Sequence, residues 1–195
     1  MPAIILETAS SQPHVILADR KKVIESFSFE KGQLVVSAID QLLKKYAIAP
    51  SELSYVACGI GPGSFTGLRL SATCIQSLSY ALTIPLITFL SLQAFTPPRK
   101  EGVFFSVILS GSTLYYLEGK KEKDTVTFSS TPTLTAPPAF HFLISPDAVA
   151  IRKRFSLACE PVSVDALFLA SYTYTKFQEK QFASIPIDIC YLKNL

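Results

Sequence analysis

The sequence predicts an α/β fold in two lobes, the second of them reduced. Three observations support this. In the first half, short apolar runs of β type alternate with two helical segments. A glycine-rich stretch, 59–69, lies between an apolar run and a helical run, as at a strand-to-helix junction. A segment rich in proline and charge, 96–102, then separates a second half. We therefore expect lobes at 1–98 and 99–195, with the last residues returning to the first lobe.

The first lobe is expected to contain five strands and two helices. The strands are expected at 3–6, 15–18, 23–29, 55–60 and 85–90, and the helices at 33–46 and 66–82. The third strand has an imperfect alternation, with Glu25 among apolar residues, which is typical of a sheet edge. The first helix has the strongest helical period in the chain, with apolar side chains at three- and four-residue steps. The order β-β-β-α-β-α-β is that of the RNase H-like half-domain of actin-like ATPases and sugar kinases.

The second lobe has weaker signals. We expect a β-hairpin at 103–109 and 113–117, strands at 125–129 and 139–144, a helix from about 163 to 180, and an extended apolar run at 185–192. A charged turn is predicted at 120–124 and irregular chain at 131–138, while 148–158 is ambiguous between helix and strand. Ser163 or Asp165 would cap the helix.

Composition and charge restrict the class of protein. Net charge is +3, and it comes from the first hundred residues, so no strong basic field predicts tight nucleic-acid binding. Only 17% of residues are charged, which fits either a partner-covered apolar surface or a compact, well-buried core. Apolar runs are too short for a membrane span, and no signal peptide is evident. Four scattered cysteines are typical of a reduced, cytoplasmic protein: Cys58, Cys74, Cys159 and Cys190.

The glycine-rich stretch admits a structural and a binding interpretation. Ser64 or Thr66 would cap the following helix, and the loop amides would suit an anion. The stretch lacks the Gly-Lys-Ser/Thr of a P-loop and the glycine spacing of a dinucleotide site. Arg69 would either bind phosphate or pin the loop to the first strand. We favour a structural loop, with an anion contact as the alternative, formed by Gly61, Gly63, Ser64, Thr66, Gly67 and Arg69.

The residue sequence of this loop also resembles the signature of a known protein family. Gly61-Pro62-Gly63-Ser64-Phe65-Thr66-Gly67-Leu68-Arg69 closely resembles the signature of the TsaB (YeaZ) family. As in that family, a helix follows, then 84–87 (Ile-Pro-Leu-Ile) and 91–94 (Ser-Leu-Gln-Ala). The resemblance is strong over 50–95, moderate over 1–49 and weak beyond 100. Residues 30–36, at the start of the first helix, differ from the family's usual sequence, and so does the turn at 109–112.

This resemblance implies a two-lobe actin-like (ASKHA) fold and a role in tRNA modification. The chain would be a catalytically inactive paralogue of TsaD. It would be a scaffold and activator for transfer of the threonylcarbamoyl group to the adenosine next to the anticodon. The implied partners are a TsaD-like catalytic subunit and a TsaE-like ATPase. A homodimer is implied when the chain is alone, tRNA would be met only through the complex, and no cofactor or membrane is expected.

Catalytic motifs are not evident in the sequence. His14 and His141 lie far apart without nearby carboxylates, so no metal site is predicted. Ser64 lies outside any Gly-x-Ser-x-Gly elbow, which disfavours a protease. Glu7, where the family usually has Asp, is a candidate vestigial cleft acid. With the glycine loop it favours the main alternative, a small-molecule kinase or ATPase of the actin-like fold.

The second helix gives the clearest indication of a partner. Arg69 is its only charged residue from 66 to 82, whereas a solvated helix face normally carries Lys and Glu. We therefore predict that both first-lobe helices form a docking face for the TsaD-like subunit, or for a second copy of this chain. The residues expected on it are Val36, Leu70, Ser71, Cys74, Tyr80 and Ala81.

Overall fold

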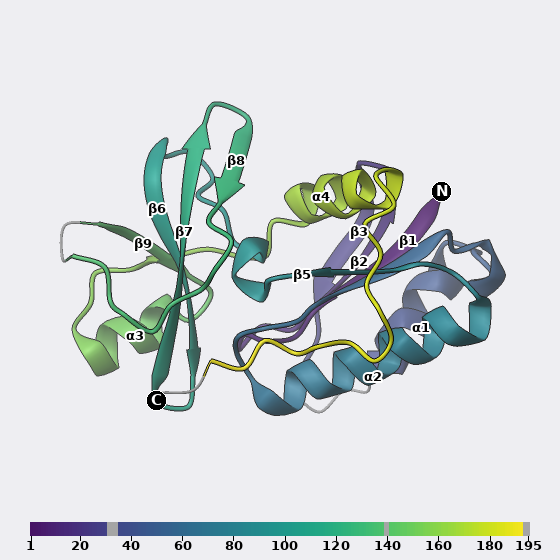
Figure 1. Cartoon of the computed structure of the whole chain (residues 1–195), viewed down its shortest axis with the longest axis horizontal. Coiled ribbons are helices and arrows are strands. Elements are labelled where there is room, and N and C mark those ends of the chain that lie inside the picture. Colours follow the sequence, from purple (N-terminus) through teal and green to yellow (C-terminus); the bar gives the residue numbers. More distant parts are fainter. Residues whose placement is uncertain (31–34, 139–140, 193–195) are drawn as a thin grey trace.

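Two five-stranded β-sheets, each covered by helices, make up the fold (Figure 1). This computed structural model describes residues 1–30, 35–138 and 141–192. The first sheet contains β1 (Pro2–Glu7), β2 (His14–Asp19), β3 (Lys22–Ser28), β4 (Tyr55–Gly59) and β5 (Leu86–Phe89). The second contains β6 (Gly102–Ser110), β7 (Thr113–Glu122), β8 (Thr125–Phe128), β9 (Phe142–Ser145) and β10 (Glu160–Pro161). The helices are α1 (Val35–Lys45), α2 (Phe65–Leu82), α3 (Ala148–Phe155) and α4 (Ala166–Gln178), with 3₁₀ turns η1 (Pro50–Glu52) and η2 (Ser91–Ala94).

The first sheet has the strand order β3-β2-β1-β4-β5. The strands β1, β4 and β5 run parallel, and β2 and β3 are antiparallel to their neighbours. Helices cover both faces of the centre, which explains the continuous apolar run in β1. The strand β3 lies at the edge, as Glu25 predicted, and the carboxylate of Glu25 pairs there with Lys45 of α1.

The helices α1 and α2 lie together on one face of this sheet, as the sequence predicted (Figure 1). The buried stripe of α1 packs on β1, β2 and β4 in one apolar cluster: Val35, Ala38, Ile39, Leu42 and Leu43. The opposite face of the sheet is covered by α4, so the carboxyl-terminal half of the chain contributes to the core of the first lobe.

The second sheet has the order β10-β9-β6-β7-β8. One face of this sheet packs on α3. Its other face contributes Phe104, Ile108 and Leu117 to the same core cluster as Leu169 and Ala170 of α4. The two sheets therefore share a core, and α4 lies where they meet.

The chain after α4 returns to the first sheet. The backbone N–H of Ala183 donates to Leu86 O at 2.8 Å, and that of Cys190 donates to Ile60 O at 2.8 Å. Between them, the N–H of Ile187 donates to the side chain of Gln76 on α2 at 2.8 Å. This segment, residues 179–192, is called the tail below.

The structure changes several predicted element bounds. The first helix begins at Val35, and Gln33 and Leu34 of the prediction lie outside the described residues. The predicted strand 139–144 is observed at 142–145, with 139–140 again outside the described residues. The ambiguous segment 148–158 contains α3. Residues 120–122 of the predicted turn extend β7, whereas 185–192, predicted as extended chain, forms neither helix nor strand.

Candidate docking face and glycine loop

The glycine loop is tied to its surroundings by its own backbone amides. The N–H of Ser64 donates to Ala9 O at 2.8 Å, and that of Gly61 donates to Ser91 Oγ at 3.0 Å. The N–H of Gly67 donates to Ser64 Oγ at 3.3 Å, so Ser64 is the N-cap of α2 and Thr66 lies within the first turn. These three amides are therefore occupied by protein acceptors, which supports the structural interpretation of the loop.

Two glycines allow the loop and α2 to approach the β1–β2 loop closely. A Cβ on Gly63 would lie 2.6 Å from Ala9 O, and one on Gly67 would lie 2.1 Å from Thr8 O. Both distances are shorter than van der Waals contact, and both neighbours are backbone atoms. A side chain at either position would therefore meet backbone, which supports the structural interpretation of the loop.

Ser71 corrects one part of the predicted docking face. Its side chain is fully buried, and its Oγ lies 2.9 Å from the Oγ1 of Thr8. Thr8 Oγ1 also lies 2.8 Å from the carbonyl oxygen of Gly67. Ser71 faces the β1–β2 loop and not the outside, so its placement on a partner surface is wrong. A small polar residue such as serine fits on either side of a helix, so the sequence alone did not indicate that Ser71 faces the core.

Glu7 lies at the carboxyl end of β1 with no exposed surface. Its Oε1 accepts a hydrogen bond from Ala9 N at 2.6 Å. Burial raises the pKa of Glu7 to about 7, against the opposing effect of hydrogen bonds from Ala9, Ser91 and Ser10. Gly59 covers this carboxyl group so closely that a Cβ there would lie 2.3 Å from Oε2. The carboxyl group therefore has no exposed surface, and its Oε2 is buried without a hydrogen-bond partner.

Arg69 connects α2 to the tail, and not to the first strand as one alternative predicted. Its Nε donates to the hydroxyl of Tyr191 at 3.3 Å, and its guanidinium lies 3.8 Å from the ring centroid of Phe65. The rings of Phe65 and Tyr191 are 5.6 Å apart. This cation–π cluster gives Arg69 a structural role on the outside of the first turns of α2.

The outer face of α1 and α2 exposes large apolar side chains. Tyr80 is 82% exposed, Val36 65% and Leu70 57%, and Ala81 is also exposed. Cys74 is half-buried and packs partly against the core. Five of the six residues predicted for the docking face are thus at least partly accessible, and we call Val36, Leu70, Tyr80 and Ala81 the α1–α2 face. Aromatic and aliphatic side chains without surrounding charge are typical of the centre of a protein interface.

Metal ligands, thiols and apolar helices are further features on which the sequence made predictions. The residues that the structure describes contain no group of three His, Cys, Asp or Glu side chains placed to hold a metal ion. The four cysteines are free thiols, and burial raises the pKa of Cys159 to about 12. No helix within the described ranges is both long and apolar enough to cross a membrane.

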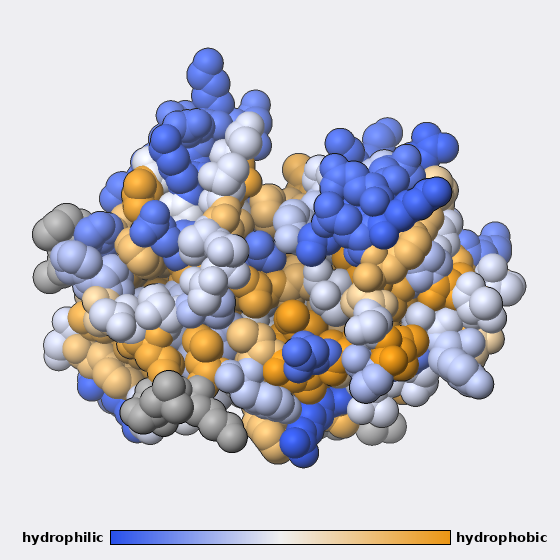
Figure 2. Space-filling view, viewed as in Figure 1, coloured by the Kyte–Doolittle hydropathy of each residue, from blue (hydrophilic) through white to orange (hydrophobic). Residues whose placement is uncertain are grey.

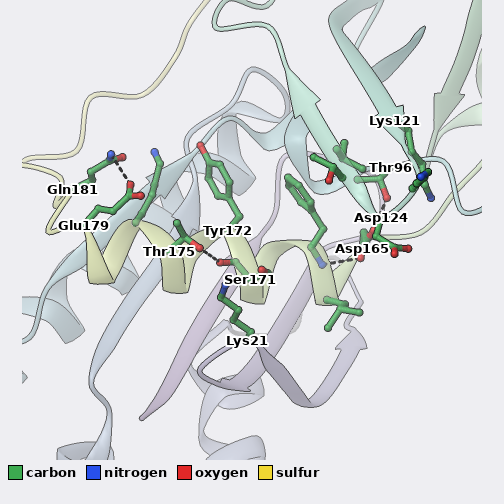
Figure 3. A pocket seen from close by; sticks show the side chains of 16 residues that line it. Lys21, Thr96, Lys121, Asp124, Asp165, Ser171, Tyr172, Thr175, Glu179 and Gln181 are labelled. Carbon is green, nitrogen blue, oxygen red and sulfur yellow. Dashed lines mark hydrogen bonds between the residues drawn. The ribbon is translucent and has the colours of Figure 1, made fainter. Parts of the chain in front are cut away.

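A groove of about 810 Å³ lies on the other side of the first sheet, over α4. Its walls come from α4, from the β7–β8 hairpin and from the turn between β2 and β3 (Figure 3). At one end, the carboxylate of Asp165 caps α4 by accepting from Phe168 N at 2.9 Å, and it also accepts from the hydroxyl of Thr96. The sequence did not predict this groove, because its three walls come from segments near residues 21, 121 and 176 that are far apart in the chain.

Comparison with known protein families assigns residues 30–159 to the model TsaD, tRNA N6-adenosine threonylcarbamoyltransferase. This range covers more than half of the chain. Curated relatives are named tRNA threonylcarbamoyladenosine biosynthesis protein TsaB. That of Buchnera aphidicola subsp. Schizaphis graminum is 33% identical over 128 residues, which are 60% of this chain and 61% of the relative.

A second such protein, from Buchnera aphidicola subsp. Acyrthosiphon pisum, is 27% identical over 97 residues, which are 47% of this chain and 44% of the relative. The chain thus matches about half the length of these curated relatives. A solved structure of YeaZ from Pseudomonas aeruginosa superposes with a TM-score of 0.73 at 17% identity, covering 94% of this chain and 96% of that one. This likeness extends the same actin-like fold over both lobes. The family match, the curated relatives and the fold agree with the loop signature, and the chain belongs to the TsaB/YeaZ family.

Proposed function

We propose that this chain is a non-catalytic subunit in the biosynthesis of threonylcarbamoyladenosine in tRNA, and that it docks on a TsaD-like catalytic subunit. The observation that carries this proposal is the α1–α2 face. It presents Leu70 and Tyr80 on α2, where Arg69 is the only charge from 66 to 82, and Val36 on α1, where Asp40, Lys44 and Lys45 are exposed nearby. Burying exposed apolar surface stabilises association, and charged residues are depleted at interface centres.

The surroundings of the glycine loop support the non-catalytic part of the proposal. Glu7 is buried beneath Gly59, and Ser64 Oγ accepts the amide of Gly67 as a helix cap. A kinase of this fold would need the acid at the end of β1 to face metal and phosphate. The geometry of Glu7 therefore argues against the alternative of a small-molecule kinase or ATPase, and the proposed role is that of scaffold and activator.

The same face suits a second copy of this chain when the catalytic subunit is absent. Two helices meeting two helices would bury a total of about 1,200–2,000 Å², the usual size of a stable interface. Homodimer and heterodimer would then compete for one surface. A TsaE-like ATPase is the further partner that this proposal includes, because the resemblance of the glycine loop to the family's signature implies one.

The experiment compares two exposed valines. Val36, 65% exposed, lies on α1, and Val149, 70% exposed, lies on α3 of the second lobe. We expect Val36→Glu to weaken binding to the TsaD-like subunit at least tenfold, measured by calorimetry, because a buried unpaired carboxylate costs several kcal/mol. Val149→Glu should bind like the parent. Equal affinity of both variants would mean that the α1–α2 face is not the docking surface.

A further inference from the structure

The groove over α4 has lysines on walls that come from three separate elements. Lys21 belongs to the turn between β2 and β3, Lys121 and Lys123 belong to β7 and its turn, and Lys176 belongs to α4. Figure 3 shows Lys21 on one side of α4, near the middle of the helix, and Lys121 toward the end of the groove where Thr96 and Asp165 lie. The groove also contains the ring of Tyr172, which stacks on Phe168 with ring centroids 5.7 Å apart.

The ammonium groups of these four lysines keep their charge available. In the described part of the chain, none of them lies within 4.0 Å of a carboxylate oxygen. Lys121 Nζ donates to the carbonyls of Pro97 and Pro98 at 2.5 and 3.0 Å, and Lys176 Nζ donates to Thr88 O at 3.2 Å. Because these acceptors are neutral, they fix the position of the lysines without cancelling their charge.

Acidic side chains in the groove are fewer and partly engaged. Asp165 caps α4 and Glu179 accepts from Gln181 at 2.9 Å, and both keep their charge because these donors are neutral. With Asp124 they give three carboxylates against four lysines in the lining of the groove. The three wall segments, 20–22, 120–124 and 176–180, contain eight Lys and Arg against three Asp and Glu. The whole chain has a net charge of only +3, so its remainder is net negative. Figure 2 shows two hydrophilic prominences, at the β7–β8 hairpin and at the end of α4, with a hollow between them.

We propose that this groove binds the phosphate backbone of RNA. Lysines are compact point charges that position a phosphate chain without reading bases, and an open groove with cations on both walls suits an extended polyanion. The inference deepens the proposed function, because the RNA on which such a complex works is tRNA. The α1–α2 face lies on the opposite side of the first sheet from α4, so RNA and the catalytic subunit would bind without competing.

The test measures binding of the full chain to an unmodified tRNA transcript by fluorescence anisotropy between 50 and 200 mM salt. Four phosphate contacts predict a slope of log K against log salt of about −3. The variant Lys21→Gln/Lys123→Gln should bind about tenfold more weakly at the lowest salt, with a slope less steep by about 1.5. The matched control is Lys153→Gln/Arg154→Gln, which removes two exposed cations of α3 that pair with no carboxylate in the described part of the chain, and it should bind like the parent.

Several results would overturn the inference. The parent could fail to bind the transcript at 50 mM salt, or the control pair could lose as much affinity as the groove pair. If polyglutamate of matched charge displaced the transcript as well as unlabelled tRNA does, the groove would be assigned to an acidic protein instead. If ATP bound stoichiometrically and the groove variant abolished that binding, the groove would be assigned to a mononucleotide. Docking is assayed in parallel: the groove variant should bind the TsaD-like subunit normally, and Val36→Glu should bind RNA normally, so the two proposals fail separately.

Discussion

Replacing Gly67 by alanine is the most direct test of how the glycine loop is built. Gly67 lies in the first turn of α2, where alanine is favoured over glycine by about 1 kcal/mol of helix propensity. Its added Cβ would lie 2.1 Å from Thr8 O, so α2 and the β1–β2 loop must move apart. Overpacking of this kind costs about 1–3 kcal/mol. The movement also weakens the hydrogen bonds of Thr8 to Gly67 O and Ser71 Oγ, about 1 kcal/mol each.

The net expectation is a loss of about 2–4 kcal/mol in the free energy of unfolding, read from urea denaturation followed by circular dichroism. For a chain of this size that corresponds to a fall in Tm of about 5–15 °C. Thr73→Ala, on the exposed side of the same helix, is the control and should leave Tm unchanged or slightly raised. A Gly67→Ala variant as stable as the parent would show that the contact with Thr8 relaxes at no cost, and the reasoning would be refuted.

Two further predictions concern buried and capping carboxylates. The pKa of Glu7 is about 7 in the folded chain and 4.5 in the unfolded chain, so the folded state binds more protons between these values. The contribution of Glu7 to the free energy of unfolding therefore falls as pH rises from 4.5 through 7, by about 3 kcal/mol at most. Burial lowers the pKa of His14, which changes stability in the opposite direction over the same range, so the test is the difference between parent and variant. Glu7→Gln should gain stability relative to the parent as pH rises from 5 to 8, and a difference that stays constant over this range would contradict the burial argument. Asp165→Ala removes the cap of α4 and the bond from Thr96, and should cost about 1–3 kcal/mol of unfolding free energy, whereas Asp188→Ala in the tail should cost little; equal effects would show that the cap is unimportant.

Much of the first lobe was predictable because its signals are local. The apolar stripe of α1, the alternation in β3 and the glycine junction before α2 each report burial or backbone geometry within a few residues of sequence. The helix α4 was predicted for the same reason, since Asp165 is a recognisable cap. Local sequence patterns could not predict that α4 covers the first sheet. That packing depends on how the chain returns from the second lobe.

The misses have physical causes of a similar kind. The helix α3 has few buried positions, and its exposed Val149 obscures the periodicity. The tail was predicted as extended chain and not as a strand, and its amides donate one at a time, to Leu86 O, the side chain of Gln76 and Ile60 O. The orientation of Ser71 is decided by Thr8, which is 63 residues away. The lysine groove went unrecognised because net charge does not record how distant segments gather in space.

The central claim is that this chain activates a catalytic subunit through the α1–α2 face and performs no chemistry itself. The most direct measurement is threonylcarbamoyladenosine formed in a tRNA transcript by the purified TsaD-like subunit, with its threonylcarbamoyl donor and the TsaE-like ATPase, as this chain is titrated in. We predict no product from this chain without the catalytic subunit, a saturable stimulation in its presence, and loss of the stimulation in Leu70→Glu/Tyr80→Glu but not in Val149→Glu. Product formed without the catalytic subunit, or full stimulation by the double variant, would contradict the account.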